Sequence, residues 1–580
     1  MKILVEDYAY SSPAVAGILA DFEPKSVKNG VSSSYVGYCF SKELNDCCFF
    51  LPKVILNKDN KVFGELCPED IVEPAKSKLN DDQKSFLSSL GIWIYRALAE
   101  YRDSNPDTVI LHEKQFSETS GTEEVSGTYL DIILSLVKFY QDNRDFVVYT
   151  LRNIHSHQHR INWQKTISRT QAIIQDDEPV YVDPISKKKV INYDEELLVI
   201  FFSILNYLKK YGFHITLDIN VNLITGELFN SYLDGLGTVR LRRIKYKYFS
   251  DKMRQLWSLC YSFFRKEEEI RSSRNESEFL MATNFNIVFE AMVDELLGNK
   301  DYDDWKKLGD GKVLDHIYKY KSVCSMEETF YIGDSKYYKV AQGVKEKSES
   351  TMKQFSYARS IVNASIRESL QDTWPYRDAL TEGYAVIPNF FIGSETDPQL
   401  RWDVDGLDRD DIVGEPFHSM QFVNRLFDRD TLWVRQYNIN FLYVLSSYAS
   451  ADDYIKGRFK EKAHRLFRQR TIDLLNRHYD FYILTPKDGK TLEEVMKGSV
   501  KWDLRGMVYR YSQTEDKLIL AFEKPDYHND DDNTKFNNSI IAEDRIMYET
   551  RVKPLFDEKP FVLSKDPENP FEFIDGCPTI

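Results

Sequence analysis

The sequence predicts a mixed α/β (α+β) protein built from several domains. Its 580 residues exceed what one hydrophobic core usually holds, so roughly three or four domains of common size are expected. Hydrophobic residues make up 42% of the chain, which is enough for packed cores. Stretches with apolar residues at helical spacing alternate with stretches rich in aromatic and β-branched residues, which are typical of strands.

The first half of the chain mixes short strands with longer helices. Residues 1–80 read as strands and turns, and residues 144–195 look extended. Helices are expected at 82–102, 129–142, 195–211 and 241–267. In the first of them four apolar residues recur near helical spacing: Phe86, Leu90, Ile94 and Ala97.

The second half begins after the charged run RKEEEIRSSRNESE, which marks a boundary near residue 270. It predicts a helix at 278–297, a strand pair at 312–340 and a helix at 350–370. A strand-rich stretch then ends near residue 450, and a basic helix follows it. These features predict four regions: 1–145, 146–270, 271–450 and 451–580.

Composition limits the possible partners. The start of the chain shows no signal peptide, and its most apolar stretches are too short to span a bilayer. We therefore expect a cytoplasmic protein without membrane contact. The formal net charge of −15 disfavours indiscriminate binding to a polyanion. A role on nucleic acid would need local basic patches or a partner that supplies affinity.

The segment TFYIGDSKYYKV contains the most informative residues of the chain. Because side chains alternate along a strand, five of them are expected on one face: Phe330, Ile332, Asp334, Lys336 and Tyr338. A carboxylate and an amine then point the same way between apolar neighbours. The preceding strand candidate, KVLDHIYKY, supplies Asp315 on the face shared by Val313 and Ile317.

A third acid, Glu290, lies beside the apolar stripe of the expected helix FNIVFEAMVDELL. Two strand carboxylates and one helix carboxylate offer the hard oxygen ligands that Mg²⁺ or Mn²⁺ prefers. Such a metal acidifies a bound water and polarises a phosphodiester. Lys336 could orient the attacking water and stabilise developing charge. D-x-K alone is common, but the order helix, strand, strand, helix is that of a restriction-endonuclease-like α-β-β-α core.

The segments FEAMVDELL, VLDHIYKY, YIGDSKYYK and MKQFSYARSI resemble successive motifs of the LlaJI/McrC-like restriction endonucleases, which belong to the PD-(D/E)XK nucleases. This resemblance covers roughly residues 150–450, including INWQKTI upstream. It implies that Asp315, Asp334 and Lys336 are the PD-(D/E)XK residues and that Glu290 is the helical acid. Gln354 and Tyr357 match a following Q-x-x-Y element near the active site. Leu314 departs from the pattern, since Pro commonly precedes the first acid.

The resemblance implies a metal-dependent endonuclease that cuts double-stranded DNA as the cleavage subunit of a restriction, or antiviral defence, system. It also implies an AAA+ GTPase partner of the McrB type, for which residues 1–270 are the candidate docking region. The alternatives are a repair or junction-processing nuclease, a nuclease that acts without a partner, and a catalytically silent scaffold that bridges a partner and DNA.

Four other patterns in the sequence give weaker evidence for a functional site. His155, His157 and His159 would share a strand face, which more often makes a polar surface than a metal site. Four cysteines without C-x-x-C spacing read as ordinary buried thiols: Cys39, Cys47, Cys48 and Cys67. The GKT at 489–491 has Leu484 where a phosphate loop needs Gly. Two basic stretches, 239–249 and 456–470, are candidates for DNA contact.

Overall fold

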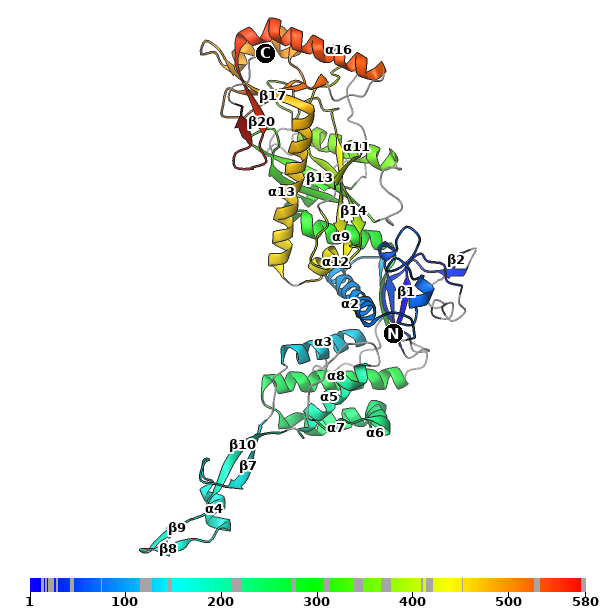
Figure 1. Cartoon of the computed structure of the whole chain (residues 1–580), viewed down its shortest axis with the longest axis vertical. Coiled ribbons are helices and arrows are strands. Elements are labelled where there is room, and N and C mark those ends of the chain that lie inside the picture. The colour runs from blue at the N-terminus through cyan, green and yellow to red at the C-terminus, as the bar shows by residue number, and fades with distance from the viewer. Residues whose placement is uncertain are drawn as a thin grey trace.

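A computed structural model shows an elongated molecule with the carboxyl-terminal sheet at one end and a slender arm at the other (Figure 1). The structure describes residues 1–11, 15, 18, 25–27, 30–41, 46–74, 76–114, 128–143, 149–192, 194–209, 221–272, 278–306, 313–337, 348–366, 377–407, 410–413, 421–450, 452–525 and 532–574. It contains several separate sheets together with many helices, as expected for a mixed α/β protein. Among these residues, no helix is long and apolar enough to cross a membrane.

The amino-terminal sheet has five strands, in the order β1 (Lys2–Val5), β5 (Asp46–Leu51), β4 (Val36–Ser41), β11 (Glu278–Ala282) and β6 (Leu111–Lys114). Strands β2 (Lys25–Val27) and β3 (Gly30–Ser32) form a separate two-stranded sheet. Helix α2 (Asp81–Ser104) packs on this sheet and confirms the helix expected at 82–102. The helix expected at 278–297 is wrong in its first part, because Glu278–Ala282 pair with β4 and β6 as a strand.

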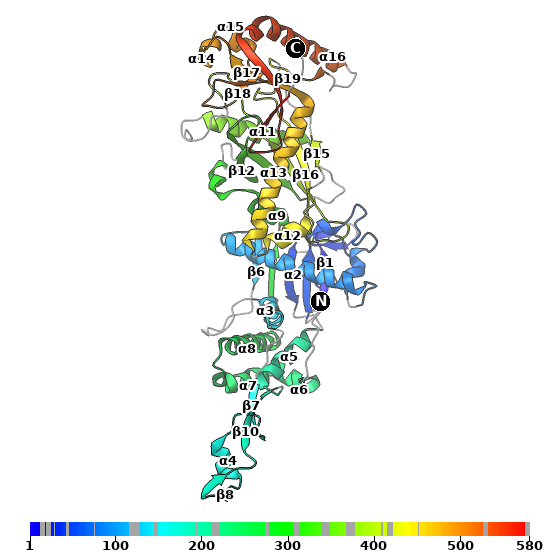
Figure 2. The same ribbon diagram turned by 60° about the vertical axis from the view of Figure 1, so that its left-hand side comes forward.

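A helical region lies below this sheet (Figure 2). It comprises α3 (Tyr129–Asp142), α5 (Glu196–Leu208), α6 (Gly226–Ser231), α7 (Gly237–Ile244) and α8 (Asp251–Ser272). Helix α3 begins at a capping box, in which the Thr128 side chain and Asp131 satisfy each other's backbone N–H groups. The helix expected at 241–267 is two helices, since η6 (Lys245–Lys247) and the non-helical residues 248–250 separate α7 from α8.

The arm projects from the helical region as a long antiparallel ribbon (Figures 1 and 2). Strands β7 (Tyr149–His155) and β10 (Ile185–Ile191) form its stem. Helix α4 (Trp163–Arg169) and the hairpin β8 (Ile173–Gln175) and β9 (Glu178–Val180) form its outer part. The extended character expected for this region is therefore interrupted by one short helix.

The central sheet has the order β12 (His316–Lys321), β13 (Glu328–Lys336), β14 (Asn389–Glu395), β16 (Val434–Asn440) and β15 (Asp410–Val413). Strand β13 is antiparallel to β12 and parallel to β14. Helix α9 (Phe285–Leu297) precedes β12, and α11 (Ser348–Ile366) follows β13. The chain thus has the expected order helix, strand, strand, helix. Short helices η7 (Lys300–Tyr302) and α10 (Asp303–Lys306) lie between α9 and β12.

The two faces of the central sheet are buried against different helices. Phe330 and Ile332 share a hydrophobic cluster with α11 residues such as Phe355. Tyr331 belongs to a larger cluster that contains residues of α9, α12 (Phe441–Tyr448) and the amino-terminal sheet. This separation confirms the alternation predicted for β13.

The carboxyl-terminal sheet has the order β18 (Val508–Arg510), β19 (Leu518–Glu523), β17 (Tyr479–Pro486), β20 (Phe556–Leu563) and β21 (Phe571–Phe573). The helices α14 (Leu492–Val495), α15 (Ser499–Asp503) and α16 (Asp532–Met547) belong to the same region (Figure 2). The long helix α13 (Asp453–His478) joins it to the central sheet. Buried Arg468 donates hydrogen bonds to the carbonyls of Ser322, Ser564 and Lys565 and so links the two sheets.

Candidate active site

Asp334 and Lys336 lie at the end of β13, on the face that α11 covers. Their side chains form an ion pair, and both are largely buried. Lys336 Nζ also lies 5.5 Å from the centre of the Phe391 ring on β14. The structure therefore places this carboxylate and this amine together, on the same side of the strand, as the alternation of side chains predicted.

Asp315 lies directly before β12 rather than inside it. Its Oδ2 accepts a hydrogen bond of 2.9 Å from the backbone N–H of Ser335, the residue between Asp334 and Lys336. Burial and, after it, the negative charge of Asp334 together raise the pKa of Asp315 to about 7. The two strand acids are therefore neighbours that repel each other when both are ionised.

Glu290 comes from helix α9, which contacts both β12 and β13. Its Oε1 accepts a weak hydrogen bond of 3.4 Å from Asn286, one turn earlier. Burial raises the pKa of Glu290, the charge of Asp334 raises it as well, and the charge of Lys336 opposes that rise. All four predicted residues thus belong to one electrostatic group.

The donor set of this group suits a hard divalent cation. Three carboxylates in partly buried surroundings, with one ammonium to balance them, carry excess negative charge, and their oxygens are the ligands that Mg²⁺ or Mn²⁺ prefers. In the part of the chain that the structure describes, no three His, Cys, Asp or Glu side chains form a ready-made metal cluster. Among the described residues, the Lys336 ammonium forms an ion pair with Asp334.

A buried histidine behind the site was not singled out from the sequence. His316 Nε2 lies 2.5 Å from Ser335 Oγ, and Nδ1 lies 3.3 Å from Asp294 Oδ1. Asp294 is one helical turn beyond Glu290, and Lys306 Nζ pairs with it at 2.5 Å. This chain of contacts ties α9 to the middle residue of the D-S-K segment. The signal available in the sequence was Asp294, which follows Glu290 at the i+4 spacing of one helix face.

Helix α11 brings Gln354 and Tyr357 to the same face of the sheet. The pKa of Tyr357 is raised by burial and then by the charges of Asp334 and Asp315, so its phenol lies near the acids. Gln354 is fully buried, and its Nε2 donates to the carbonyl of Phe390 at 3.5 Å. Its Oε1 has no hydrogen-bond partner among the described residues. Tyr338 lies outside the described residues.

The weaker candidates are placed elsewhere. Strand β7 ends at His155, so His157 and His159 do not share its face, and His155 pairs with Asp183 at 2.8 Å. Cys39, Cys47 and Cys48 are buried as expected, but Cys67 is exposed. The GKT turn leads into α14, a helix of 4 residues. In the basic helix α13, several cations bind the protein itself, among them Lys462, which pairs with Asp405.

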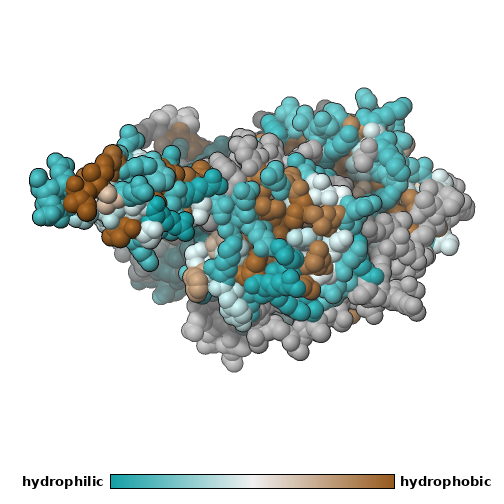
Figure 3. Space-filling model, turned by 90° about the horizontal axis from the view of Figure 1, so that it is seen from below, coloured by the Kyte–Doolittle hydropathy of each residue, from teal (hydrophilic) through white to brown (hydrophobic). Residues whose placement is uncertain are grey.

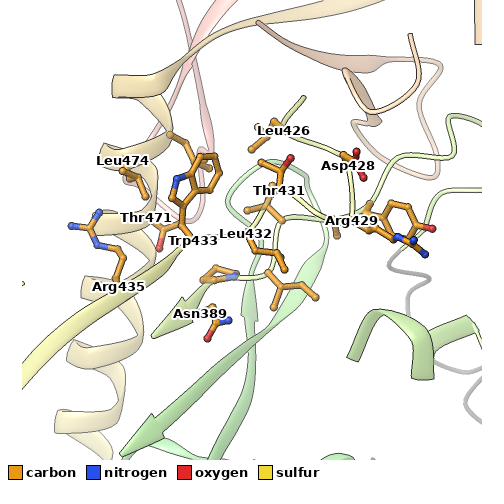
Figure 4. Close-up of a pocket in the computed structure, with 16 residues that line it drawn as sticks. Asn389, Leu426, Asp428, Arg429, Thr431, Leu432, Trp433, Arg435, Thr471 and Leu474 are labelled. Atoms are coloured by element: carbon orange, nitrogen blue, oxygen red, sulfur yellow. The ribbon is translucent and has the colours of Figure 1, made fainter. Parts of the chain in front are cut away.

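A pocket elsewhere on the central sheet is separate from these acids (Figure 4). It is lined by Asn389, Trp433 and Arg435, near the start of β14 and β16, and by residues of α13 such as Leu474. Asn389 pairs with Ile332, whereas Lys336 pairs with Gly393, toward the other end of β14. The pocket therefore lies toward the opposite end of the strand from Lys336.

Comparison with known proteins agrees with the resemblance seen in the sequence. The model of the LlaJI restriction endonuclease family matches residues 54–374, more than half of the chain. The chain belongs to the LlaJI restriction endonuclease family.

No curated protein matches the chain. One similar solved structure is that of Thermococcus gammatolerans McrB AAA+ hexamers with bound McrC, at 13% identity. The match covers 80% of this chain and 99% of that chain, with a TM-score of 0.25. At that TM-score the likeness carries no argument about this chain.

Proposed function

We propose that this chain is a Mg²⁺- or Mn²⁺-dependent endonuclease that hydrolyses double-stranded DNA as the cleavage subunit of a restriction system. The observation that carries the proposal is the electrostatic group at the end of β13. The charge of Asp334 raises the pKa of both Asp315 and Glu290, and Lys336 forms an ion pair with Asp334. Membership of a restriction endonuclease family supports the same reaction.

In the proposed mechanism, Asp315, Asp334 and Glu290 hold the metal through their carboxylate oxygens. When bound, the metal supplies Lewis acidity for the phosphodiester and lowers the pKa of its water. Lys336 orients the attacking water and stabilises the negative charge that develops on the phosphoryl oxygens. The Ser335 N–H orients the Asp315 carboxylate, and Tyr357, close to the acids, forms part of the wall that excludes bulk water.

Single-turnover cleavage of duplex DNA tests the catalytic assignment. Lys336→Ala is expected to slow cleavage by about 10³-fold or more, because charge stabilisation in a site of this kind contributes several kcal/mol to the barrier. The matched control is Lys321→Ala, which removes a half-buried lysine from the neighbouring strand. Cleavage by Lys336→Ala at the wild-type rate would contradict the assignment of this site as the catalytic site. Absence of cleavage by the wild type would favour a catalytically silent scaffold.

We further propose an AAA+ partner of the McrB type, which docks on residues 1–270 and principally on the arm. Supporting this, the arm exposes several large apolar side chains, and gathered exposed apolar residues mark protein–protein contact sites. Ile174 is 75% exposed, and Ile167, Ile173 and Val182 are also exposed. Seen from below, the projecting arm carries hydrophobic residues on its surface (Figure 3). The net charge of −15 also favours recruitment to DNA by another protein.

Co-purification with the neighbouring gene product tests this docking region. Ile173→Ser with Ile174→Ser should abolish co-purification, because both residues lie near the tip of the arm and pack little against the rest of the chain. Ile546→Ser is the control, since Ile546 is similarly exposed in the carboxyl-terminal region. Full co-purification of the arm variant, or full cleavage by the isolated chain without partner or nucleotide, would contradict the docking proposal.

A further inference from the structure

Tyr337 directly follows Lys336 and connects two parts of the candidate active site. Its ring is buried and lies 5.6 Å from the ring of Phe285 and 5.8 Å from that of Phe289, both on α9. Phe289 is the residue before Glu290. The Tyr337 ring therefore packs on the helix that carries one proposed metal ligand, and its backbone directly follows the strand that carries another.

The hydroxyl of Tyr337 reaches into the amino-terminal sheet. It donates a hydrogen bond of 2.6 Å to Oε2 of Glu6, which follows β1 and is only 4% exposed. Glu6 Oε2 also accepts the backbone N–H of Lys53, at 3.1 Å. The Lys53 ammonium lies 3.6 Å from Glu6 Oε1 and 5.3 Å from the centre of the Tyr337 ring. Glu6 and Lys53 together thus hold the phenol from two sides.

The same amino-terminal segment also contacts the next strand of the central sheet. Lys53 begins the short helix η2 (Lys53–Ile55), and the carbonyl of Val54 accepts a hydrogen bond of 3.0 Å from Thr396 Oγ1. Thr396 follows β14, and Gly393 of that strand pairs with Lys336. Helix η2 is therefore attached to β13 and β14 at the end where the acids gather.

A second connection is covalent. Strand β11 is an inner strand of the amino-terminal sheet, and α9 begins three residues after it ends. The helix that carries Glu290 thus continues directly from that sheet. Two of the elements that carry proposed metal ligands, α9 and β13, are thus anchored to the amino-terminal sheet, β13 through Tyr337 and α9 through its direct connection to β11.

We propose that Tyr337 is a positioning residue, and that Glu6 and Lys53 use its hydroxyl to set Lys336 and Glu290 in their working geometry. Burying the Glu6 carboxylate has a desolvation cost that an apolar contact would not have. The ring alone would suffice for packing on Phe285 and Phe289. The hydroxyl, through its hydrogen bond to Glu6, additionally fixes the orientation of the ring. The inference rests on the proposed function and extends it: the amino-terminal sheet forms part of the cleavage machinery.

The test compares Tyr337→Phe and Glu6→Gln with a matched control, Tyr331→Phe. Tyr331 is a buried tyrosine of the same strand, whose hydroxyl donates to the carbonyl of Lys321 at 2.9 Å. Mn²⁺ binding to the full chain is measured by titration calorimetry. Loss of a group that orients metal ligands typically weakens binding by about 10-fold or more. We expect that loss in Tyr337→Phe, a similar or smaller loss in Glu6→Gln, and wild-type binding in Tyr331→Phe.

Single-turnover cleavage gives the second readout. Tyr337→Phe and Glu6→Gln should each slow the reaction at saturating metal. Their double variant should be no slower than the worse single variant, since both remove the same interaction. Wild-type Mn²⁺ binding in both single variants, or losses equal to that of Tyr331→Phe, would overturn the inference. If Asp334→Ala binds Mn²⁺ as tightly as the wild type, the proposed function itself fails instead.

Discussion

Asp315 is expected to destabilise the folded protein at alkaline pH, and Asp315→Asn should relieve this cost. Its pKa rises from an ordinary 3.8 to about 7 because it is buried beside Asp334. A carboxyl with a raised folded pKa contributes stability that is fully present below the unfolded value and is lost as pH rises through the folded value. At about 1.4 kcal/mol for each pKa unit, the ionised carboxylate costs up to ~4 kcal/mol at pH 8.

Thermal unfolding in EDTA at pH 4 and at pH 8 measures this cost. At pH 4 the melting temperature of Asp315→Asn should equal that of the wild type. At pH 8 it should be higher than that of the wild type, by up to ~10 °C. The amide oxygen can still accept the Ser335 N–H. Mg²⁺ should stabilise the wild type at pH 8 and have much less effect on the variant.

The control for this measurement is Asp304→Asn, which makes the same exchange at an exposed position on α10, outside the buried site. If the difference in melting temperature between Asp315→Asn and the wild type is the same at pH 8 as at pH 4, Asp315 is not buried beside Asp334 as described, and the reasoning is refuted.

Three further predictions concern a buried arginine between two sheets, the histidine behind the site and the choice of metal. Arg468→Met should destabilise the chain by roughly 3 kcal/mol in urea denaturation, because it leaves three backbone carbonyls, two of them in buried surroundings, without this donor; an unchanged midpoint would contradict this. His316→Ala should lower stability by roughly 2 kcal/mol and also slow cleavage, since it links Asp294 to Ser335; loss of stability without loss of rate would limit it to a structural role. Ca²⁺ should compete with Mg²⁺ without supporting turnover, and cleavage in Ca²⁺ at the Mg²⁺ rate would speak against the proposed metal geometry.

The central sheet was predictable because its signals are local. Alternation along TFYIGDSKYY placed Asp334 and Lys336 on one face, and β13 confirms it. The strands and helices around them also occur in the expected order. By contrast, β11 was mistaken for the start of a helix. Its partners β4 and β6 lie far away in the sequence, and pairing at such a distance overrides local propensity.

The contacts that orient the site were beyond sequence reasoning for the same reason. Glu6 and Tyr337 meet across 331 residues of chain, and no local spacing connects them. His316 carries no local signal that sets it apart in the segment KVLDHIYKY, and its contacts depend on Asp294 and Ser335, which come from different elements. The four acidic and basic residues could be named from the motif, whereas what holds them in place required the fold.

The most direct test of the central claim is cleavage of duplex DNA by the wild type and by Asp334→Ala, in Mg²⁺ and in EDTA, with the neighbouring gene product present. Asp334 lies at the centre of the group, since its charge affects the pKa of Asp315, Glu290 and Tyr357. We predict rapid cleavage only by the wild type in Mg²⁺, with cleavage by the variant slower by about 10³-fold or more. Cleavage by Asp334→Ala at the wild-type rate, or by the wild type in EDTA, would contradict the account.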